Sequence, residues 1–323
     1  MAPKVLVLGA TGFIGGHIAR AALAEGWEVY GLRRDPTRIG RLPPAPIIWR
    51  QGDLDHPDSL RAAFEGQEIV FHAAGYYPSH NRHIPQQVEY ATQQTQRVLE
   101  AAQSSGVRTL VYTSSLTTIG SPPKGSDRLA NERDVYQPGQ VHGSAYYACK
   151  IAMEREVLQW SEAGHQAVVL NPTVVIGPGD RPNGLSQIVM AIHRGWARVW
   201  LPVTINVVDV RDVAHAHIAA ARVGRSGQRY ILGAKNIPMR DYFVMAAVAL
   251  GAPAPRLEIP LGLAEVFFRW FGWLPPLASA AGHIYGLRHW QGYDTGLARQ
   301  ELGLTTRAPQ ETLCDTLAWM LKP

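Results

Sequence analysis

The sequence predicts an α/β protein built around a doubly wound parallel β-sheet. In the first half of the chain, short runs of apolar residues alternate with longer amphipathic stretches. The apolar runs lack the polar alternation of half-exposed strands, so they are typical of strands buried on both faces. Because the stretches between them have helical length and spacing, we expect parallel strands joined by helical crossovers. A chain of 323 residues, 46% of them hydrophobic, can bury a core of that size.

The first predicted strand is KVLVLGA, at residues 4–10, and an amphipathic helix follows it at residues 15–26. This helix and the one predicted at residues 93–106 both end at a glycine, which is common at the carboxyl end of a helix. The other predicted strands are short apolar runs bounded by glycine or polar turns, at residues 28–32, 69–75, 109–115 and 167–177.

Beyond about Gly177 the alternation becomes irregular, and Pro, Gly and Trp are more frequent. Residues 205–222 predict a strand that leads into a helix beginning at Asp209 or Asp212. Residues 227–234 predict a further short strand.

We therefore expect two domains. The first, residues 1–176, carries the main sheet. The second, residues 177–323, is smaller, and its residues from about 204 to 234 return to the main sheet. The tail contains two short helical pieces, at residues 292–304 and 311–320.

The charge and the cysteine content limit the classes of partner. The net charge is +5 and the isoelectric point is near 9.3. However, the arginines are scattered, and no zinc-ligand, helix-turn-helix or RNA-recognition pattern accompanies them. We therefore expect no nucleic-acid partner and interpret the basicity as suited to a small phosphate-bearing ligand. The two cysteines, Cys149 and Cys314, are too few for a disulfide framework, which favours a reducing, cytoplasmic location.

The longest apolar region, residues 259–286, does not predict a membrane span. Glu265, Arg269 and the pair Pro275–Pro276 interrupt it below the length that a span needs. We interpret the region as packing or a substrate lid, with contact to a membrane surface as a further alternative. Its Trp-rich part, residues 267–276, is expected to form a roof over an apolar substrate, a carboxyl-terminal core or a dimer contact.

The motif GATGFIGG lies between the first strand and the first helix. Gly9, Gly12 and Gly15 have the spacing G-x-x-G-x-x-G. Gly9 allows the tight turn, Gly12 lets backbone N–H groups approach a pyrophosphate, and Gly15 lets the helix pack close to the sheet. The amino end of the helix also favours an anion. In this position the motif predicts dinucleotide binding and a Rossmann-type sheet.

The residues at the end of the second strand favour NADP(H) over NAD(H). An acidic residue there would bind the ribose 2′-hydroxyl of NAD. This chain has Arg33 and Arg34 instead, whose guanidinium groups suit a 2′-phosphate. Asp35 follows them and can still reach the ribose, so NAD(H) stays possible. Asp53, in the segment QGDLDHP, is expected at the adenine end of the crevice or in an ordinary turn.

The segment GSAYYACK carries two tyrosines before a lysine. On a helix, Tyr146 is four residues and Tyr147 three residues before Lys150, and both offsets place side chains on neighbouring surface. By itself this spacing fits either a catalytic tyrosine whose pKa the lysine lowers or an aromatic core face.

The chain resembles the extended short-chain dehydrogenase/reductase (NAD-dependent epimerase/dehydratase) family in blocks that occur in the expected order: GATGFIGG, GDL, HAAG, YTSS and YYACK. The later blocks LNPTVVIGPGD and VVDVRDVAHAH look like the dihydroflavonol reductase-like and 3β-hydroxysteroid dehydrogenase-like branch. The resemblance covers nearly the whole chain. It implies a Rossmann-type domain with a smaller carboxyl-terminal substrate-binding domain, and an NAD(P)-dependent oxidoreductase.

The resemblance also implies roles for individual residues. Tyr146 corresponds to the family's acid/base, Lys150 lowers the pKa of its phenol and binds the nicotinamide ribose, and Ser115 holds the substrate oxygen. The expected substrate-pocket residues are Tyr76, Tyr77, His80 and Tyr147. The expected cofactor contacts are Gly9, Thr11, Gly12, Phe13, Ile14, Gly15, Arg33, Arg34, Asp53, Leu54, Ala73, Ala74, Gly75, Thr113, Ser114, Tyr146, Lys150, Pro172, Thr173 and Val174.

Two residues depart from the family pattern. Cys149 stands where the family often has serine, which removes a hydrogen-bonding hydroxyl but spares the chemistry. Ala91 stands where the family often has asparagine, so we expect one supporting interaction to be missing there. His72, His80 and His83 lack further Cys, Asp or Glu ligands at suitable spacing, and we expect no metal site.

These observations predict an NADPH-dependent reductase of aldehydes or ketones that also works in reverse as an alcohol dehydrogenase. The alternative is a nucleotide-sugar epimerase or dehydratase with tightly held NAD, in which Arg181, Arg194 and Arg198 bind the substrate diphosphate. A non-catalytic dinucleotide sensor is a third hypothesis, against which the retention of Tyr146 and Lys150 argues. The resemblance further implies a homodimer formed by pairing helices, including the tyrosine helix.

Overall fold

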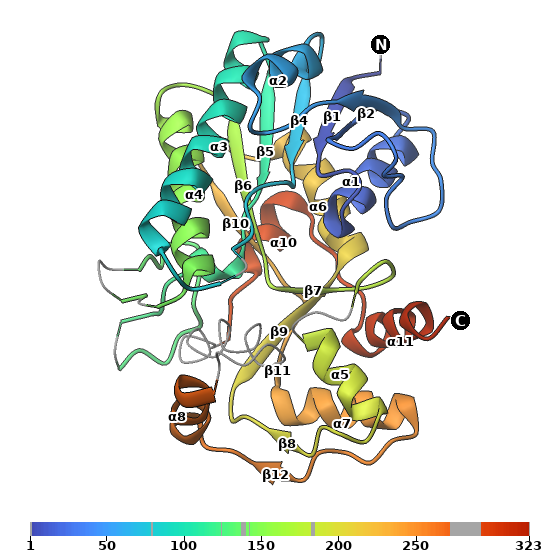
Figure 1. Ribbon diagram of the computed structural model, residues 1–323, viewed down its shortest axis with the longest axis vertical. Helices are drawn as coiled ribbons and strands as arrows, with labels where there is room; N and C mark the ends of the chain where they lie inside the picture. The colour runs from blue at the N-terminus through green and yellow to red at the C-terminus, as the bar shows by residue number, and fades with distance from the viewer. Residues whose placement is uncertain are drawn as a thin grey trace.

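The predicted α/β fold is confirmed by the computed structural model, which describes residues 2–78, 80–123, 125–136, 140–141, 143–181, 185–271 and 292–322. Its main sheet has the strand order β10-β6-β5-β4-β1-β2-β3, and every neighbouring pair is parallel (Figure 1). The order reverses at β1 and β4, and in such sheets ligands bind outside the carboxyl ends of the strands at that reversal. The strands are β1 (Lys4–Leu8), β2 (Glu28–Arg33), β3 (Ile48–Gln51), β4 (Ile69–His72), β5 (Thr109–Thr113), β6 (Ala167–Pro172) and β10 (Arg229–Leu232).

Helices cover both faces of this sheet. On one face α1 (Phe13–Ala24) packs beside α6 (Val210–Val223). The other face carries α2 (Pro57–Phe64), α3 (Ile84–Ser104) and α4 (Ala145–Glu162), of which α3 packs against both neighbours.

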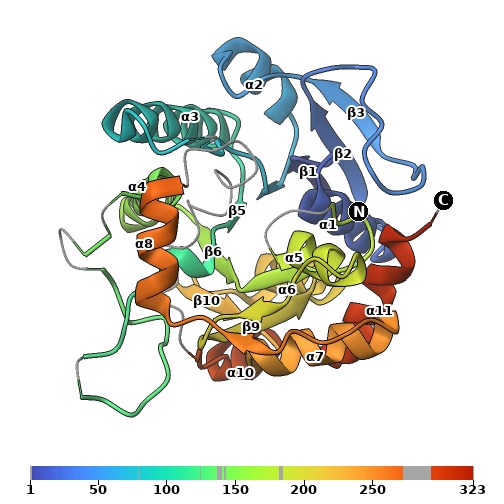
Figure 2. The same cartoon turned by 60° about the horizontal axis from the view of Figure 1, so that its bottom comes forward.

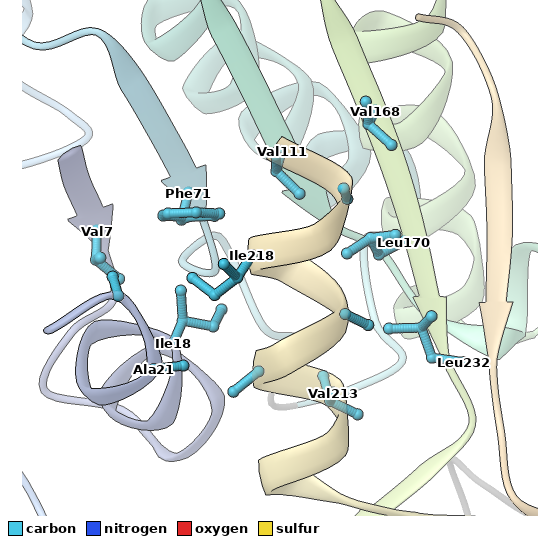
Figure 3. Packing of buried hydrophobic residues seen from close by; sticks show 14 of the residues in the cluster. Val7, Ile18, Ala21, Phe71, Val111, Val168, Leu170, Val213, Ile218 and Leu232 are labelled. Carbon is cyan, nitrogen blue, oxygen red and sulfur yellow. The ribbon is translucent and has the colours of Figure 1, made fainter. Parts of the chain in front are cut away.

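Successive strand residues point into two different cores, because side chains alternate across a strand. Val7, Phe71 and Val111 pack with residues of α1 and α6 (Figure 3). Leu8 and Tyr112 belong to the core on the opposite face, together with residues of α2, α3 and α4. All five side chains are buried, which explains why these strands show no polar alternation in the sequence.

The predicted strand at residues 167–177 is divided between two sheets. β6 ends at Pro172 in the main sheet, and β7 (Val174–Ile176) pairs with β9 (Thr204–Asp209) in a second sheet of order β11-β9-β7. Thr173 stands between them, and its N–H donates to Leu232 O at 2.9 Å. Its side chain donates to Asn206 of the second sheet at 3.1 Å, so this residue joins the two sheets.

Residues 204–234 contribute to both sheets. β9 lies in the second sheet, where β11 (Lys235–Pro238) is its antiparallel neighbour. α6 and β10 then complete the main layer, with β10 at its edge beside β6. The boundary between the domains, placed after residue 176, stays a prediction.

Most of the remaining elements surround a third core below the main sheet in Figure 1, while a 3-10 turn and one short helix among them pack against the main sheet instead. None of the described helices is long and apolar enough to cross a membrane. Residues 272–291 lie outside the described part of the chain, so the predicted Trp-rich roof falls only partly within it. These elements are η1 (Leu116–Thr118), α5 (Leu185–His193), β8 (Val199–Trp200), α7 (Met239–Leu250), β12 (Leu257–Glu258), α8 (Leu261–Phe271), α10 (Gly296–Leu302) and α11 (Pro309–Met320).

Candidate active site

The glycine motif forms a tight turn between β1 and α1. Gly9 has a φ of +86°, a conformation that side chains disfavour, and a Cβ there would lie 2.7 Å from Ala73 O. A Cβ on Gly15 would lie 2.6 Å from the carbonyl carbon of Gly9. Gly12 is the N-cap of α1 in extended conformation, and no side chain caps the helix there. The close backbone approach and an amino end without a side-chain cap fit the diphosphate of a dinucleotide.

The predicted adenine-end residues lie together at the ends of β2 and β3. Arg34 Nε is 3.9 Å from Asp53 Oδ2, and the Arg34 side chain is largely exposed. The Arg33 guanidinium lies over the Trp49 ring, 5.0 Å from its centroid. Asp35 accepts two hydrogen bonds from Thr37, which lower the pKa of its carboxyl group. Asp35 is therefore engaged in its own turn, while the two arginines remain at the sheet edge.

The structure brings Ser115 and Tyr146 together. Ser115 follows β5 and caps η1, where its Oγ accepts from Thr117 N at 3.2 Å. Tyr146 lies in the first turn of α4, which Ser144 caps by accepting from Tyr147 N. The Tyr146 hydroxyl donates to Ser115 Oγ at 3.4 Å. Two hydroxyl groups thus meet at the carboxyl edge of the sheet, on the same edge as the glycine turn.

Lys150 lies one turn further along α4, with its Nζ 5.8 Å from the centroid of the Tyr112 ring. Burial lowers the pKa of the lysine to about 8, although the carboxylate of Glu154 and then the thiol of Cys149 act in the opposite direction. Burial also raises the pKa of the Tyr146 phenol, and the hydrogen bond to Ser115 only partly offsets this.

The direction of the Tyr146 shift is opposite to the one predicted from the sequence. Both groups are at least partly buried, and desolvation is the largest influence on the pKa of each. It suppresses the phenolate directly, and it weakens the ammonium that was expected to stabilise the phenolate. In this structure the phenol of Tyr146 is therefore protonated at neutral pH.

The aromatic residues predicted for the substrate pocket have different surroundings. The Tyr77 ring lies 4.8 Å from the Tyr146 ring, and the side chain is exposed. Tyr76 instead turns towards α3, where its hydroxyl donates to Gln87 Oε1 at 2.8 Å. Tyr147 is buried, and its ring contacts those of Tyr146 and a further tyrosine, Tyr136. His80 also contacts Gln87, and its Nδ1 accepts from the backbone of Arg82.

The predicted cofactor residues after β4 and β5 lie beside the glycine turn and α4. Ala73 approaches Gly9, as described, and Gly75 has a φ of +140°. A Cβ on Gly75 would lie 2.6 Å from Cε of Met153 on α4. Thr113 forms a hydrogen bond with the buried His217 ring at 2.7 Å, so its hydroxyl faces α6.

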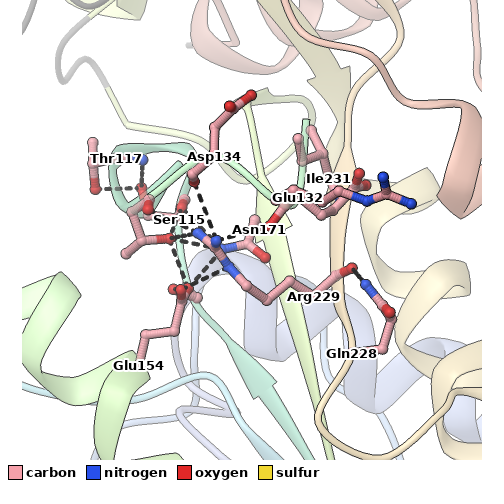
Figure 4. A network of polar contacts seen from close by, with 12 residues as sticks. Ser115, Thr117, Glu132, Asp134, Glu154, Asn171, Gln228, Arg229 and Ile231 are labelled. Carbon is pink, nitrogen blue, oxygen red and sulfur yellow. Dashed lines mark hydrogen bonds and ion pairs between the residues drawn. The ribbon is translucent and has the colours of Figure 1, made fainter. Parts of the chain in front are cut away.

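A buried ion pair that was not predicted lies next to this site (Figure 4). Glu154, one turn after the lysine on α4, pairs with Arg229 of β10, with Oε1 and Nε 2.9 Å apart. Oε2 of Glu154 accepts a short hydrogen bond from Ser114, one from Thr118 Oγ1 at 2.7 Å and one from Asn171 Nδ2 at 2.6 Å. The carboxylate thereby ties α4 to the serine loop and to β6.

The guanidinium of Arg229 also binds the serine loop, at Thr118, and in addition the segment that contains Glu132. Its Nη2 donates to Thr118 O at 2.7 Å, and its Nη1 donates to Glu132 O at 2.9 Å. The Glu132 side chain in turn accepts from Ile231 N of β10 at 2.9 Å. Two sequence features could have indicated this pair: an acid four residues after Lys150, on a helix with a buried face, and an arginine inside the apolar strand RYIL.

Among the described residues, no group of three His, Cys, Asp or Glu side chains could hold a metal ion. His72, at the end of β4, is fully surrounded by protein, and burial lowers its pKa to about 3, with a smaller contribution from Lys150. Burial also raises the pKa of the Cys149 thiol to about 11. Both groups are therefore neutral at physiological pH.

Comparison with known proteins points to one family. A model described as "NAD dependent epimerase/dehydratase family" matches residues 5–233, which include β1, the glycine turn, Ser115, Tyr146 and Lys150. The match begins at the second residue of β1 and ends just beyond β10, and so it spans nearly the whole main sheet.

Individual relatives cover nearly the full chain. A putative dihydroflavonol 4-reductase from Synechocystis is 33% identical, covering 99% of this chain and 95% of the relative. A sterol demethylase protein B from Methylococcus capsulatus is 27% identical, covering 97% of both chains. The crystal structure of a nucleoside-diphosphate-sugar epimerase from Pseudomonas aeruginosa superposes with a TM-score of 0.84 at 26% identity, covering 99% of this chain and 97% of that one.

The burial of the ion pair predicts that Glu154 and Arg229 contribute a large coupling energy to the stability of the protein. The variants Glu154→Gln and Arg229→Gln should each destabilise the protein strongly, because each leaves a charge without its partner in the interior, at a cost of about 3–5 kcal/mol. A double-mutant cycle measured by urea unfolding should give a coupling of roughly 2 kcal/mol or more.

The matched control is the pair formed by Arg222 and Glu25, whose side chains are half exposed. The same cycle there should give about 0–1 kcal/mol, since water screens the charges. Equal coupling energies for the two pairs would contradict the structural role assigned to Glu154 and Arg229.

Proposed function

The chain belongs to the NAD dependent epimerase/dehydratase family, whose members are NAD(P)-dependent enzymes, and we propose that it is an NADPH-dependent reductase of aldehydes or ketones. In reverse it would act as an alcohol dehydrogenase. The observation that carries this proposal is the pair of hydroxyl groups of Ser115 and Tyr146, 3.4 Å apart, beside Lys150 and at the same sheet edge as the glycine turn.

The proposed reaction divides the work between cofactor and protein. When bound, the nicotinamide supplies the hydride for the carbonyl carbon. Tyr146 gives its proton to the carbonyl oxygen as that oxygen gains charge. Its raised pKa suits this direction, because the phenol keeps its proton until a stronger base forms next to it. Ser115 donates a hydrogen bond to the same oxygen and so fixes the carbonyl group against the phenol.

Lys150 is proposed to stabilise the phenolate that Tyr146 leaves behind. A lysine with a pKa of about 8 is charged at neutral pH, and it is one helical turn from the phenol. The negative charge of Glu154 helps to keep it protonated. The buried carboxylate is therefore proposed as a positioning group that acts on Tyr146 through Lys150.

The surroundings of Tyr146 favour a carbonyl substrate of low polarity over a nucleotide sugar. The rings of Tyr77, Tyr147 and Tyr136 are near it, in contact with one another or with Tyr146. Two of the arginines considered for a sugar-nucleotide diphosphate lie away from the site, in the segment between α5 and β8. Arg194 lies over the Trp196 ring, and Arg198 donates to Gly195 O.

The name of the Synechocystis relative also describes a reductase. We further propose that the cofactor is NADP(H), with Arg34 and Arg33 at the 2′-phosphate, and that the protein is a homodimer. For the dimer, α3 and α4 offer two long helices side by side on the outer face of the main sheet (Figure 1). A cytoplasmic location and the lack of a nucleic-acid partner stay predictions.

The two adjacent tyrosines allow a matched test of the acid/base assignment. Tyr146→Phe should lower kcat by 100-fold or more, since acid catalysis of this kind contributes on the order of 10²–10⁴. Tyr147→Phe removes a hydroxyl from a buried ring and should leave kcat within a few fold. The measurement is the loss of NADPH absorbance with a panel of aldehydes and ketones. The reverse pattern would reject Tyr146 as the proton donor.

The cofactor proposal predicts that Arg34→Ala weakens NADPH binding about tenfold or more and leaves NADH binding nearly unchanged. Charge-assisted contacts to a phosphate are worth roughly 1.5–3 kcal/mol. Arg61→Ala, which removes an exposed arginine from α2, is the control for net charge. The titration follows quenching of protein fluorescence. Tighter binding of NADH than of NADPH by the unmodified protein would show that the 2′-phosphate assignment is wrong.

The pKa of Lys150 predicts how kcat/KM depends on pH. The charged form of this lysine is the active one and its pKa is about 8, so kcat/KM should be full below that pH and fall as the pH rises through it. In Lys150→Arg the cation keeps its proton at alkaline pH. The residual activity of this variant should therefore show no decline between pH 7 and 9.5. An identical alkaline decline in both proteins would assign the titration to another group.

A further inference from the structure

The outer face of α8 is apolar where a surface helix is normally polar. Leu263, Val266, Phe267, Trp270 and Phe271 follow the spacing of a single helical stripe, and their exposed fractions range from 43% for Val266 to 68% for Trp270. The stripe that packs on the third core is a different one, formed by Leu261, Ala264 and Phe268. The helix therefore packs on the third core through one stripe and exposes the apolar side chains of the other to a large extent.

Exposed apolar side chains also lie on a strand pair at the same end of the molecule as α8 (Figure 1). In the parallel pair of β8 and β12, Val199 and Leu257 are direct partners, and both are exposed. Trp196, just before β8, is 74% exposed. β8, β12 and α8 lie at the end of the molecule farthest from the main sheet, and this end faces the viewer in Figure 2. We call the eight residues of the strand pair, the preceding loop and α8 the distal apolar surface: Trp196, Val199, Leu257, Leu263, Val266, Phe267, Trp270 and Phe271.

The segments that carry the distal apolar surface contain more arginines than acids. Within residues 193–200 and 256–271 there are four arginines and two acids, and all four arginines are exposed. The Arg194 guanidinium lies over the Trp196 ring, 5.4 Å from its centroid. The arginines are Arg194, Arg198, Arg256 and Arg269, and the acids are Glu258 and Glu265.

We propose that the distal apolar surface docks onto the surface of an anionic lipid bilayer. Exposed Trp, Phe and Leu side chains on one helical face, flanked by arginines, are the composition of helices that lie in the membrane interface. The rings and aliphatic chains enter the boundary of the acyl region, and the arginines bind lipid phosphates. The protein docks from one side, since none of its described helices can span the bilayer.

The charge pattern favours a lipid surface over a second copy of the chain. A two-fold contact through this surface would bring the same patch of each copy together. The four arginines of one copy would then face those of the other, with only two acids each to compensate. The surface of an anionic bilayer carries a charge opposite to that of the arginines. Just below its phosphates it also accommodates apolar side chains. This docking goes beyond the proposed reductase activity and does not depend on it.

The test is sedimentation of the full chain with vesicles of phosphatidylcholine alone or of phosphatidylcholine with one third phosphatidylglycerol. We expect binding to the anionic vesicles at low salt, at least tenfold weaker binding to the neutral ones, and a marked loss of binding at 0.5 M salt. No binding to anionic vesicles at low salt would overturn the proposal.

Two variants separate the apolar and the charged contributions. Phe267→Ser/Trp270→Ser and Arg194→Gln/Arg256→Gln should each weaken binding to anionic vesicles at least tenfold. The matched controls are Ile39→Ser, an exposed apolar residue elsewhere, and Arg61→Gln/Arg108→Gln, both of which should bind like the unmodified protein. Because all substituted side chains are exposed, thermal unfolding should confirm an unchanged fold.

Two results would overturn the proposal even if the unmodified protein binds vesicles. In one, the α8 variant and the Ile39→Ser control bind equally well. In the other, light scattering without lipid shows a dimer that Phe267→Ser/Trp270→Ser converts to a monomer. The second result would assign the surface to self-association.

Discussion

The arrangement of the candidate site depends on the ion pair between Glu154 and Arg229. Two buried charges are costly to remove from water, and the cost is offset only where geometry and hydrogen bonding are good. Here the carboxylate accepts from three side chains and the guanidinium donates to three backbone carbonyls. The pair therefore ties together α4, the serine loop, β6 and β10, four elements that are far apart in the sequence (Figure 4).

This connection explains how the side chains of the candidate site are held. Ser115 comes from the loop after β5, while Tyr146 and Lys150 come from α4, and a network fixed to both orients the hydroxyl groups towards each other. The same burial that makes the network rigid also lowers the pKa of Lys150 and raises that of Tyr146. The close packing of the network and the shifted pKa values of Lys150 and Tyr146 thus have one physical origin, the burial of these groups next to the sheet.

Much of the fold could be predicted from the sequence, because its signals are local. Strands such as β1 and β5 are apolar throughout, since Val7 and Leu8, or Val111 and Tyr112, enter opposite cores. The glycine turn was also predictable, because Gly9 and Gly15 are positions where a Cβ meets backbone atoms. The break at Thr173 was not predictable, because it depends on hydrogen bonds to Asn206 and Leu232, more than thirty residues away.

The sequence alone determined the parallel sheet, the dinucleotide turn and the presence of two tyrosines before a lysine. The helical spacing alone left open which tyrosine lies next to the serine, because both offsets to Lys150 are compatible with contact on a helix, and the resemblance to the family favoured Tyr146. The tertiary structure gives the physical arrangement: the rotation of α4 places Tyr146 against Ser115 and turns Tyr147 into the interior. Distant partners hold α4 in that rotation, among them Arg229 on Glu154 and Gly75 beside Met153. Local patterns could indicate that Glu154 and Arg229 are buried, but the meeting of residues so far apart in the sequence is decided by the tertiary structure.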